Sequence, residues 1–172
     1  INKRFDLGMQ PNMVKLSFTL PNDSVIYLTG ADTNFDELEK LLGQKYSRIV
    51  IDEAQSWRQD LKELVYSKLK PAVADYRGQI ILLGTPSNVR SGLFYEVTQG
   101  LVPGWSVHRW TAYENPYMRE QWTAEIEELS TVNPQVVNEP WFRQNYLGEW
   151  TIDEQALVYQ YKPELCDLKE TP

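Results

Sequence analysis

The chain has 172 residues, of which 42% are hydrophobic, so it is long enough for one domain with a sizeable core and too short for a second full domain. Its 24 acidic and 17 basic residues give a formal net charge of −7, which argues against a generic DNA-coating surface but leaves room for a local basic patch. No apolar run approaches the ~20 residues that span a membrane, and no basic-plus-apolar leader is present, so we expect a soluble protein. The single cysteine, Cys166, excludes an internal disulfide and a cysteine-based zinc site.

The first part of the chain predicts a β-hairpin followed by a short helix. Residues 14–20 alternate apolar and polar side chains, Pro21 to Ser24 supply turn chemistry, and residues 25–28 return as a second strand. After a break at residues 30–32, a short helix begins with acids and is stopped by Gly43. Its expected apolar face consists of Phe35, Leu38, Leu41 and Leu42.

The stretch from Arg48 to Trp57 organises the rest of the chain. Ile49, Val50 and Ile51 predict a strand buried on both faces, as in a parallel sheet. Asp52 and Glu53 follow at its C-terminal end, which is where open α/β sheets bind their ligands. The pattern is that of a Walker B motif, in which Asp52 helps to hold Mg²⁺ while Glu53 orients and deprotonates the attacking water. The alternative interpretation is a strand that simply ends in two solvated acids.

A second strand with a polar turn at its end favours the nucleotide interpretation. Residues 79–83 predict another buried strand, and Gly84 to Asn88 form a small polar turn suited to sensing a phosphate or the hydrolytic water. Because parallel strands place their carboxyl ends together, Asp52, Glu53 and Thr85 are expected to cluster at one edge of the sheet. Between the strands we expect a helix at residues 59–69 that ends or restarts at Pro71. Its inward side chains are Leu61, Leu64, Val65 and Leu69.

The second half predicts three helices, one further strand and a polar tail. We expect a short helix at residues 93–97 and, at residues 105–110, another member of the sheet in which His108 has a structural place. The next helix follows Asn115 and Pro116, and residues 141–150 predict an aromatic helix packed on the domain edge. The first of these two helices has an inward face of Met118, Trp122, Ile126 and Leu129, and outward acids at Glu125, Glu127 and Glu128.

Strands separated by helices, with acids and a Thr-Pro turn at two strand ends, predict an α/β fold. We expect a mostly parallel sheet flanked by helices on both faces, of the RecA-like (ASCE) P-loop ATPase type and incomplete at the N-terminus. The order and spacing of the motifs together resemble the large terminase subunit of tailed bacteriophages, from about Met13 to Tyr161. The motifs are the hairpin leading into Gly30-Ala31-Asp32, the helix ending at Gly43, residues 49–55, Leu83-Gly84-Thr85-Pro86, Glu114-Asn115-Pro116 and Tyr146-Leu147-Gly148-Glu149-Trp150.

This resemblance implies part of a motor that couples ATP hydrolysis to the translocation of double-stranded DNA into a procapsid. Asp52 would match the acid that binds Mg²⁺ and ATP, and Glu53 the catalytic glutamate. Gly84 and Thr85 would match the motif that couples hydrolysis to movement. The partners implied are the portal protein, the small terminase subunit and further copies in a homo-oligomeric ring, with no membrane. The implied location is the host cytoplasm, docked on the portal.

The sequence departs from the family in three places. It contains no glycine-rich Walker A loop ending in Lys-Thr or Lys-Ser, and no acid cluster of a nuclease domain. Some relatives carry an arginine where this chain has Leu42, which leaves Arg48 and Arg90 as candidates for a trans-acting arginine. Because the chain also begins at Ile1, we expect a partial ATPase domain at residues 1–150 and a linker or truncated nuclease start at 151–172. Without the Walker A amides and lysine, the chain alone is expected to be inactive.

Two other interpretations remain open at this stage. A helicase-type motor fragment would share the Asp-Glu strand end, although the Leu-Gly-Glu-Trp close and the absence of helicase-like basic motifs favour the terminase. A non-catalytic interaction module of prophage origin would keep the sheet and bind a partner. A nucleotide-binding measurement separates the enzymatic interpretations from the last one.

Overall fold

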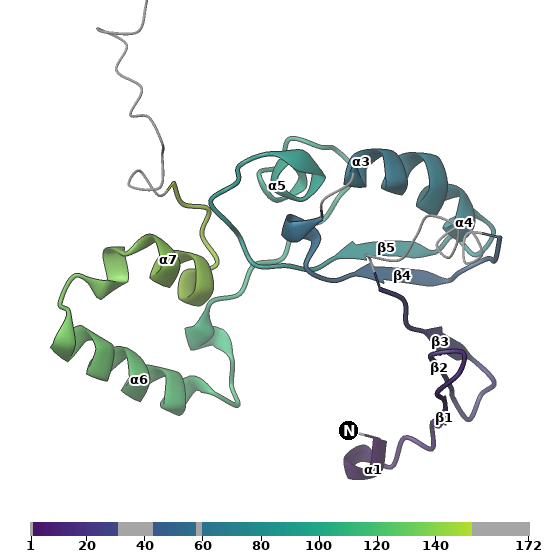
Figure 1. Ribbon diagram of the computed structural model, residues 1–172, viewed down its shortest axis with the longest axis horizontal. Helices are drawn as coiled ribbons and strands as arrows, with labels where there is room; N and C mark the ends of the chain where they lie inside the picture. Colours follow the sequence, from purple (N-terminus) through teal and green to yellow (C-terminus); the bar gives the residue numbers. More distant parts are fainter. Residues whose placement is uncertain (1, 31–42, 58–59, 153–172) are drawn as a thin grey trace, which may run out of the picture. The chain divides into compact units, whose positions relative to one another are not determined.

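A computed structural model describes residues 2–30, 43–57 and 60–152 (Figure 1). The chain divides into two compact units, one formed by Ile1–Ile49 and Tyr66–Gln79 and the other by Val50–Val65 and Ile80–Pro172. Three features of the sequence lie outside the described residues: the helix expected before Gly43, the position of Leu42, and Cys166. Among the described helices, none is both long and apolar enough to cross a membrane.

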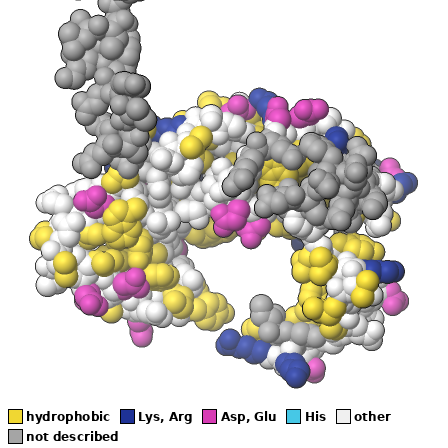
Figure 2. Space-filling view, viewed as in Figure 1, with side chains coloured by type: hydrophobic (Ala, Val, Ile, Leu, Met, Phe, Trp, Pro, Cys, Tyr) yellow, Lys and Arg dark blue, Asp and Glu magenta, His cyan; other side chains and the backbone are white. Residues whose placement is uncertain are grey.

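The first unit contains a helix and a small antiparallel sheet. Helix α1 spans Asn2–Phe5, and strands β1 (Gln10–Asn12), β2 (Ser17–Thr19) and β3 (Val25–Tyr27) pair in the order β1-β2-β3. The predicted hairpin is confirmed, since Ser17 pairs with Tyr27 and Thr19 with Val25. Strand β1 is an addition that the sequence did not predict. All three residues of β3 are exposed, and Figure 2 shows hydrophobic side chains in yellow over this sheet.

Strands β4 (Arg48–Ile51) and β5 (Gln79–Leu82) form a separate two-stranded sheet. The Gln79 amide donates to the Ser47 carbonyl at 3.1 Å, and the Leu83 amide donates to the Ile51 carbonyl at 2.8 Å. Because the partners advance in the same direction along both strands, the pair is parallel, as predicted. The expected burial on both faces is wrong. Val50 is 52% exposed between the more buried Ile49 and Ile51, so among the described residues β4 has one covered face.

The helical segment between the two strands is continuous. It comprises α3 (Leu61–Glu63), a π-helical turn η2 (Leu64–Leu69) and α4 (Lys70–Ala74). The four side chains predicted to face inward are all buried: Leu61, Leu64, Val65 and Leu69. Pro71 lies in the first turn of α4 without ending the helical path. The π turn directly precedes the position where Pro71 removes a backbone amide donor.

In the second unit, a short helix packs beside the end of β4. The 3-10 helix η1 (Ala54–Ser56) contacts α5 (Gly92–Thr98), which also contacts α3. Leu93, Phe94 and Val97 on α5 are buried, which confirms the predicted helix. Trp150 packs against α5. Its Nε1 donates to Thr98 Oγ1 at 3.0 Å, and its ring lies edge-on to the ring of Tyr95.

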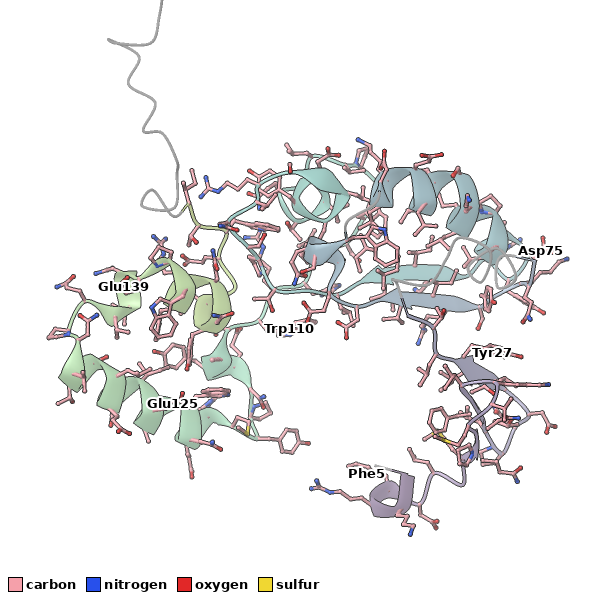
Figure 3. The ribbon with its side chains drawn as sticks, in the orientation of Figure 1. Phe5, Tyr27, Asp75, Trp110, Glu125 and Glu139 are labelled. Atoms are coloured by element: carbon pink, nitrogen blue, oxygen red, sulfur yellow. The ribbon has the colours of Figure 1, made fainter. Side chains whose placement is uncertain are left out.

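A helical cluster follows in the same unit. It contains η3 (Ala112–Glu114), α6 (Arg119–Val132), η4 (Val136–Asn138) and α7 (Pro140–Leu147). Ile126, Val136 and Phe142 form its buried core, and Phe142 is fully buried against the stacked ring of Tyr146. Both predicted helices are therefore confirmed. Glu125, labelled on α6 in Figure 3, is not a purely solvated acid as expected. It accepts a 2.9 Å hydrogen bond from the Tyr146 hydroxyl.

The strand predicted at residues 105–110 is wrong. This segment has no strand or helix assignment, and Val107, His108 and Trp110 are exposed. An alternation of apolar and polar side chains forms a strand only where a neighbouring strand can pair with it, and no described strand pairs with this segment. His108 is exposed and stacks on Trp110 with ring centroids 6.3 Å apart, so the place in a sheet expected for it is wrong as well.

Candidate functional site

The two predicted acids lie directly after β4 in a tight turn. Asp52 and Glu53 are exposed, and Asp52 Oδ1 accepts a hydrogen bond from the Glu53 amide at 3.0 Å. Glu53 has φ 52° and ψ 39°, the left-handed conformation, immediately before η1. A residue other than glycine rarely adopts this backbone conformation, because it costs roughly 1 kcal/mol or more. The turn therefore holds Glu53 in a mildly strained backbone conformation.

The second predicted motif lies beside this turn. Gly84 and Thr85 follow β5 and are exposed. The Leu83 carbonyl accepts from the Ala54 amide at 2.8 Å, in addition to the bond from the Leu83 amide to Ile51. These two bonds bring the ends of β4 and β5 to one edge of the sheet, as parallel pairing requires. Thr85 makes no hydrogen bond to either acid within the described part of the chain.

Gln55 links the two turns, and the sequence analysis did not single it out. Its Nε2 donates to Glu53 Oε2 at 2.5 Å. Its Oε1 is buried and accepts no hydrogen bond from the described residues. Oε1 would lie only 2.0 Å from a Cβ built on Gly84, so the absence of a side chain at Gly84 makes room for it. The signal available in the sequence was an amide two positions after the predicted base.

One acid at this edge has the chemistry to bind a cation. Mg²⁺ keeps several waters and uses one or two protein carboxylates together with substrate phosphates. Asp52 fits this pattern, since it is exposed and only its Oδ1 is engaged by a backbone amide. No group of three or more His, Cys, Asp and Glu side chains within residues 2–30, 43–57 and 60–152 is placed to hold a metal ion.

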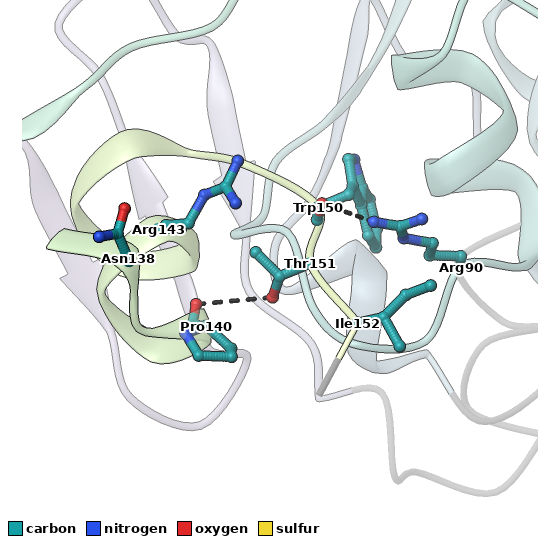
Figure 4. Close-up of a pocket in the computed structure, with 7 residues that line it drawn as sticks. All are labelled: Arg90, Asn138, Pro140, Arg143, Trp150, Thr151 and Ile152. Carbon is teal, nitrogen blue, oxygen red and sulfur yellow. Dashed lines mark hydrogen bonds between the residues drawn. The ribbon is translucent and has the colours of Figure 1, made fainter. Parts of the chain in front are cut away.

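The two arginines considered for a trans-acting role are engaged elsewhere. Arg48 begins β4, at the opposite end of that strand from the acids, and its Nη2 donates to Gln79 Oε1 at 3.2 Å. Arg90 donates to the Trp150 carbonyl at 3.0 Å and lines a cavity of about 290 Å³ (Figure 4). The other residues that line this cavity are Asn138, Pro140, Arg143, Trp150, Thr151 and Ile152. Arg143 is paired there with Glu149 at 2.7 Å.

Comparison with known proteins gives two structural likenesses. No protein-family model matches the sequence, and no curated protein matches it. The large terminase ATPase domain of Thermus phage P74-26, in a mutant form, matches with 16% identity and a TM-score of 0.49, over 87% of this chain and 66% of that one. The same domain without the mutation matches with 13% identity and a TM-score of 0.48, over 87% of this chain and 67% of that one. The chain thus spans about two thirds of the length of the domains it matches.

Proposed function

We propose that this chain is part of a DNA-packaging motor ATPase, the large terminase subunit of a tailed phage, which couples ATP hydrolysis to DNA translocation into a procapsid. The observation that carries the proposal is the meeting of two turns at one sheet edge. The Asp52-Glu53 turn after β4 and the Gly84-Thr85 turn after β5 are joined through the Ala54 to Leu83 hydrogen bond. The motif order along the sequence, as set out above, supports the same proposal.

Each residue at the edge has a role in this scheme. Glu53 is the general base, which orients the attacking water and accepts its proton. Asp52 would hold Mg²⁺, which neutralises charge on the phosphates when it is bound. Gly84 and Thr85 form the turn that responds to the nucleotide. Double-stranded DNA, the portal protein, the small terminase subunit and neighbouring copies in a ring are the proposed partners, in the host cytoplasm at the portal.

The phosphate cradle is the part that the sequence lacks. Triphosphate binding depends on backbone amides at a helix N-terminus and on a lysine, and the two acids repel phosphates unless these groups and Mg²⁺ offset them. The turn from Gly84 to Asn88 contains no lysine and is too short to substitute. In the proposed motor, a Walker A segment outside this sequence supplies the cradle.

Calorimetric titration with Mg²⁺-ATP tests the proposal. The 172-residue chain should bind Mg²⁺-ATP weakly or not at all and should not hydrolyse it. Fusion to the upstream segment of the same gene should restore micromolar binding and turnover. Micromolar binding and turnover by the chain alone would place the phosphate site elsewhere. A fusion that neither binds nor hydrolyses ATP would favour the interaction-module alternative.

A further inference from the structure

The side chain of Gln55 lies between the predicted base and the turn after β5. One end of its amide is fixed by Glu53, since Nε2 donates to Oε2 at 2.5 Å. The other end faces Gly84, where a Cβ would be 2.0 Å from Oε1 and 3.1 Å from Cδ. Gly84 has no left-handed backbone conformation, so a side chain there would conflict with the present position of the Gln55 amide rather than with the backbone angles.

The backbone around this side chain is held more firmly than the side chain itself. The bonds from Leu83 to Ile51 and from Ala54 to Leu83 are both 2.8 Å, and Ala54 is 3% exposed. The amide oxygen of Gln55, in contrast, is buried without a donor from the described residues. A buried acceptor that lacks a donor is costly, and no hydrogen bond from the described residues opposes movement of this end of the side chain.

We propose that Gln55 is a positioning residue that couples the Gly84 turn to the orientation of the Glu53 carboxylate. The inference rests on the proposed function. By donating to Oε2, the amide leaves Oε1 of Glu53 as the acceptor for the proton of the attacking water. A displacement of the turn changes the space around the Gln55 oxygen, rotates the amide and releases the carboxylate. A movement of the turn would therefore change the orientation of the base.

Steady-state kinetics of the intact ATPase test the positioning role. Gln55→Ala should lower kcat by ~10-fold while leaving KM for ATP within about twofold, because the bond orients the base and does not bind substrate. Gln55→Met, which keeps the volume, should behave in the same way. Gln121→Ala is the matched control, since Gln121 is exposed on α6. Unchanged kcat in both Gln55 variants, or a rise in KM without a fall in kcat, would overturn the role.

A double-mutant cycle tests the link to the turn. Gly84→Ala should displace the Gln55 oxygen and lower kcat by about as much as Gln55→Ala. In the Gln55→Ala background the side chain is gone, and the next nearest group is the Ala54 amide nitrogen at 3.3 Å, so Gly84→Ala should add little. If Gly84→Ala lowers kcat by the same factor in the wild type and in the Gln55→Ala background, the two residues act separately.

A measurement without nucleotide separates this inference from the proposed function. In the 172-residue chain, the side-chain amide protons of Gln55 should give NMR signals that shift in both Glu53→Gln and Gly84→Ala, with Gln121 unshifted. If those shifts occur but the intact protein hydrolyses no ATP, the coupling holds and the proposed function fails. If ATP is hydrolysed but Gly84→Ala leaves the Gln55 signals unchanged, the coupling is wrong and the function stands.

Discussion

The two ends of β5 each carry a glycine, and the two glycines face different kinds of neighbour. A Cβ at Gly78, before the strand, would lie 2.6 Å from the Ser47 carbonyl oxygen and 2.8 Å from the Tyr46 carbonyl oxygen. A Cβ at Gly84, after the strand, would meet the amide of Gln55 first. Neither glycine has a left-handed conformation, so what a side chain would meet at each position is a close neighbour rather than a forbidden backbone angle.

The difference separates a fixed end from an adjustable end. At Gly78 the obstacle is the backbone of Tyr46 and Ser47, which is held by hydrogen bonds from the Tyr46 amide to the Ala72 carbonyl and from the Gln79 amide to the Ser47 carbonyl. At Gly84 the obstacle is the far end of a flexible side chain, which can rotate away. The first end secures the strand pairing, while the second carries the groups proposed to act on the nucleotide.

The largest expected effect is on folding and comes from Gly78→Ala. Backbone cannot yield by several tenths of an ångström without losing hydrogen bonds, so the free energy of unfolding should fall by about 3 kcal/mol. Urea unfolding of the 172-residue chain measures this, with Gly84→Ala as the control and an expected loss under about 1 kcal/mol. Equal losses in the two variants would remove the distinction between the two ends.

The next effect is on catalysis and comes from Glu53→Gln at the adjustable end. The amide cannot accept a proton, so turnover in the intact protein should fall by ~10²-fold or more while nucleotide binding persists. Asp52→Asn should instead weaken Mg²⁺ dependence and binding. Glu127→Gln, on the exposed side of α6, is the control. Hydrolysis at the normal rate in Glu53→Gln would remove Glu53 from the mechanism.

Backbone strain gives a third, smaller contrast between the two ends of the β4-β5 sheet. One residue near each end has the left-handed backbone conformation. Arg77 has φ 48° and Glu53 has φ 52°. Arg77→Gly should raise the free energy of unfolding by up to ~1 kcal/mol with no catalytic cost. The side chain is exposed, so its removal loses little packing, while glycine adopts this conformation without strain. Glu53→Gly should relieve similar strain but abolish turnover. If Arg77→Gly also slows hydrolysis, strain at the two ends does not divide into structural and functional parts.

Much of the fold was predictable because local patterns decided it. The turn at Pro21 to Ser24 predicted the hairpin, and the spacing of Leu61, Leu64, Val65 and Leu69 predicted a buried helix face. The prediction failed at residues 105–110, where alternation alone cannot show whether a partner strand exists. It also failed for the exposed Val50, because an apolar run does not reveal how many neighbours cover a sheet.

The candidate site also has a part that the sequence predicted and a part that it did not. The strand-end rule predicted that the acids and the Gly84 turn would share an edge, and the 2.8 Å bond between Ala54 and Leu83 agrees. Gln55 could not be found by that rule, because its position depends on a side-chain rotamer and on the space left by a glycine far along the sequence. Such a contact is a tertiary property that no local pattern encodes.

The smallest expected effect is a pH dependence at the fixed end of the sheet. Lys45 forms an ion pair with Asp75, and the hydrogen bond and charge of that carboxylate raise the pKa of Lys45 above 10.5. A raised folded pKa means that the pair stabilises the fold fully below the unfolded pKa of lysine, and that this stabilisation is lost as the pH rises through the folded value. Both side chains are exposed, so salt should screen the contribution. The urea midpoint of the wild type should therefore exceed that of Lys45→Gln slightly at pH 8, and the two should converge as the pH rises through the folded pKa of Lys45. A gap that widens at high pH, or one that 1 M salt leaves unchanged, would show that Lys45 stabilises this end through packing of its stem instead.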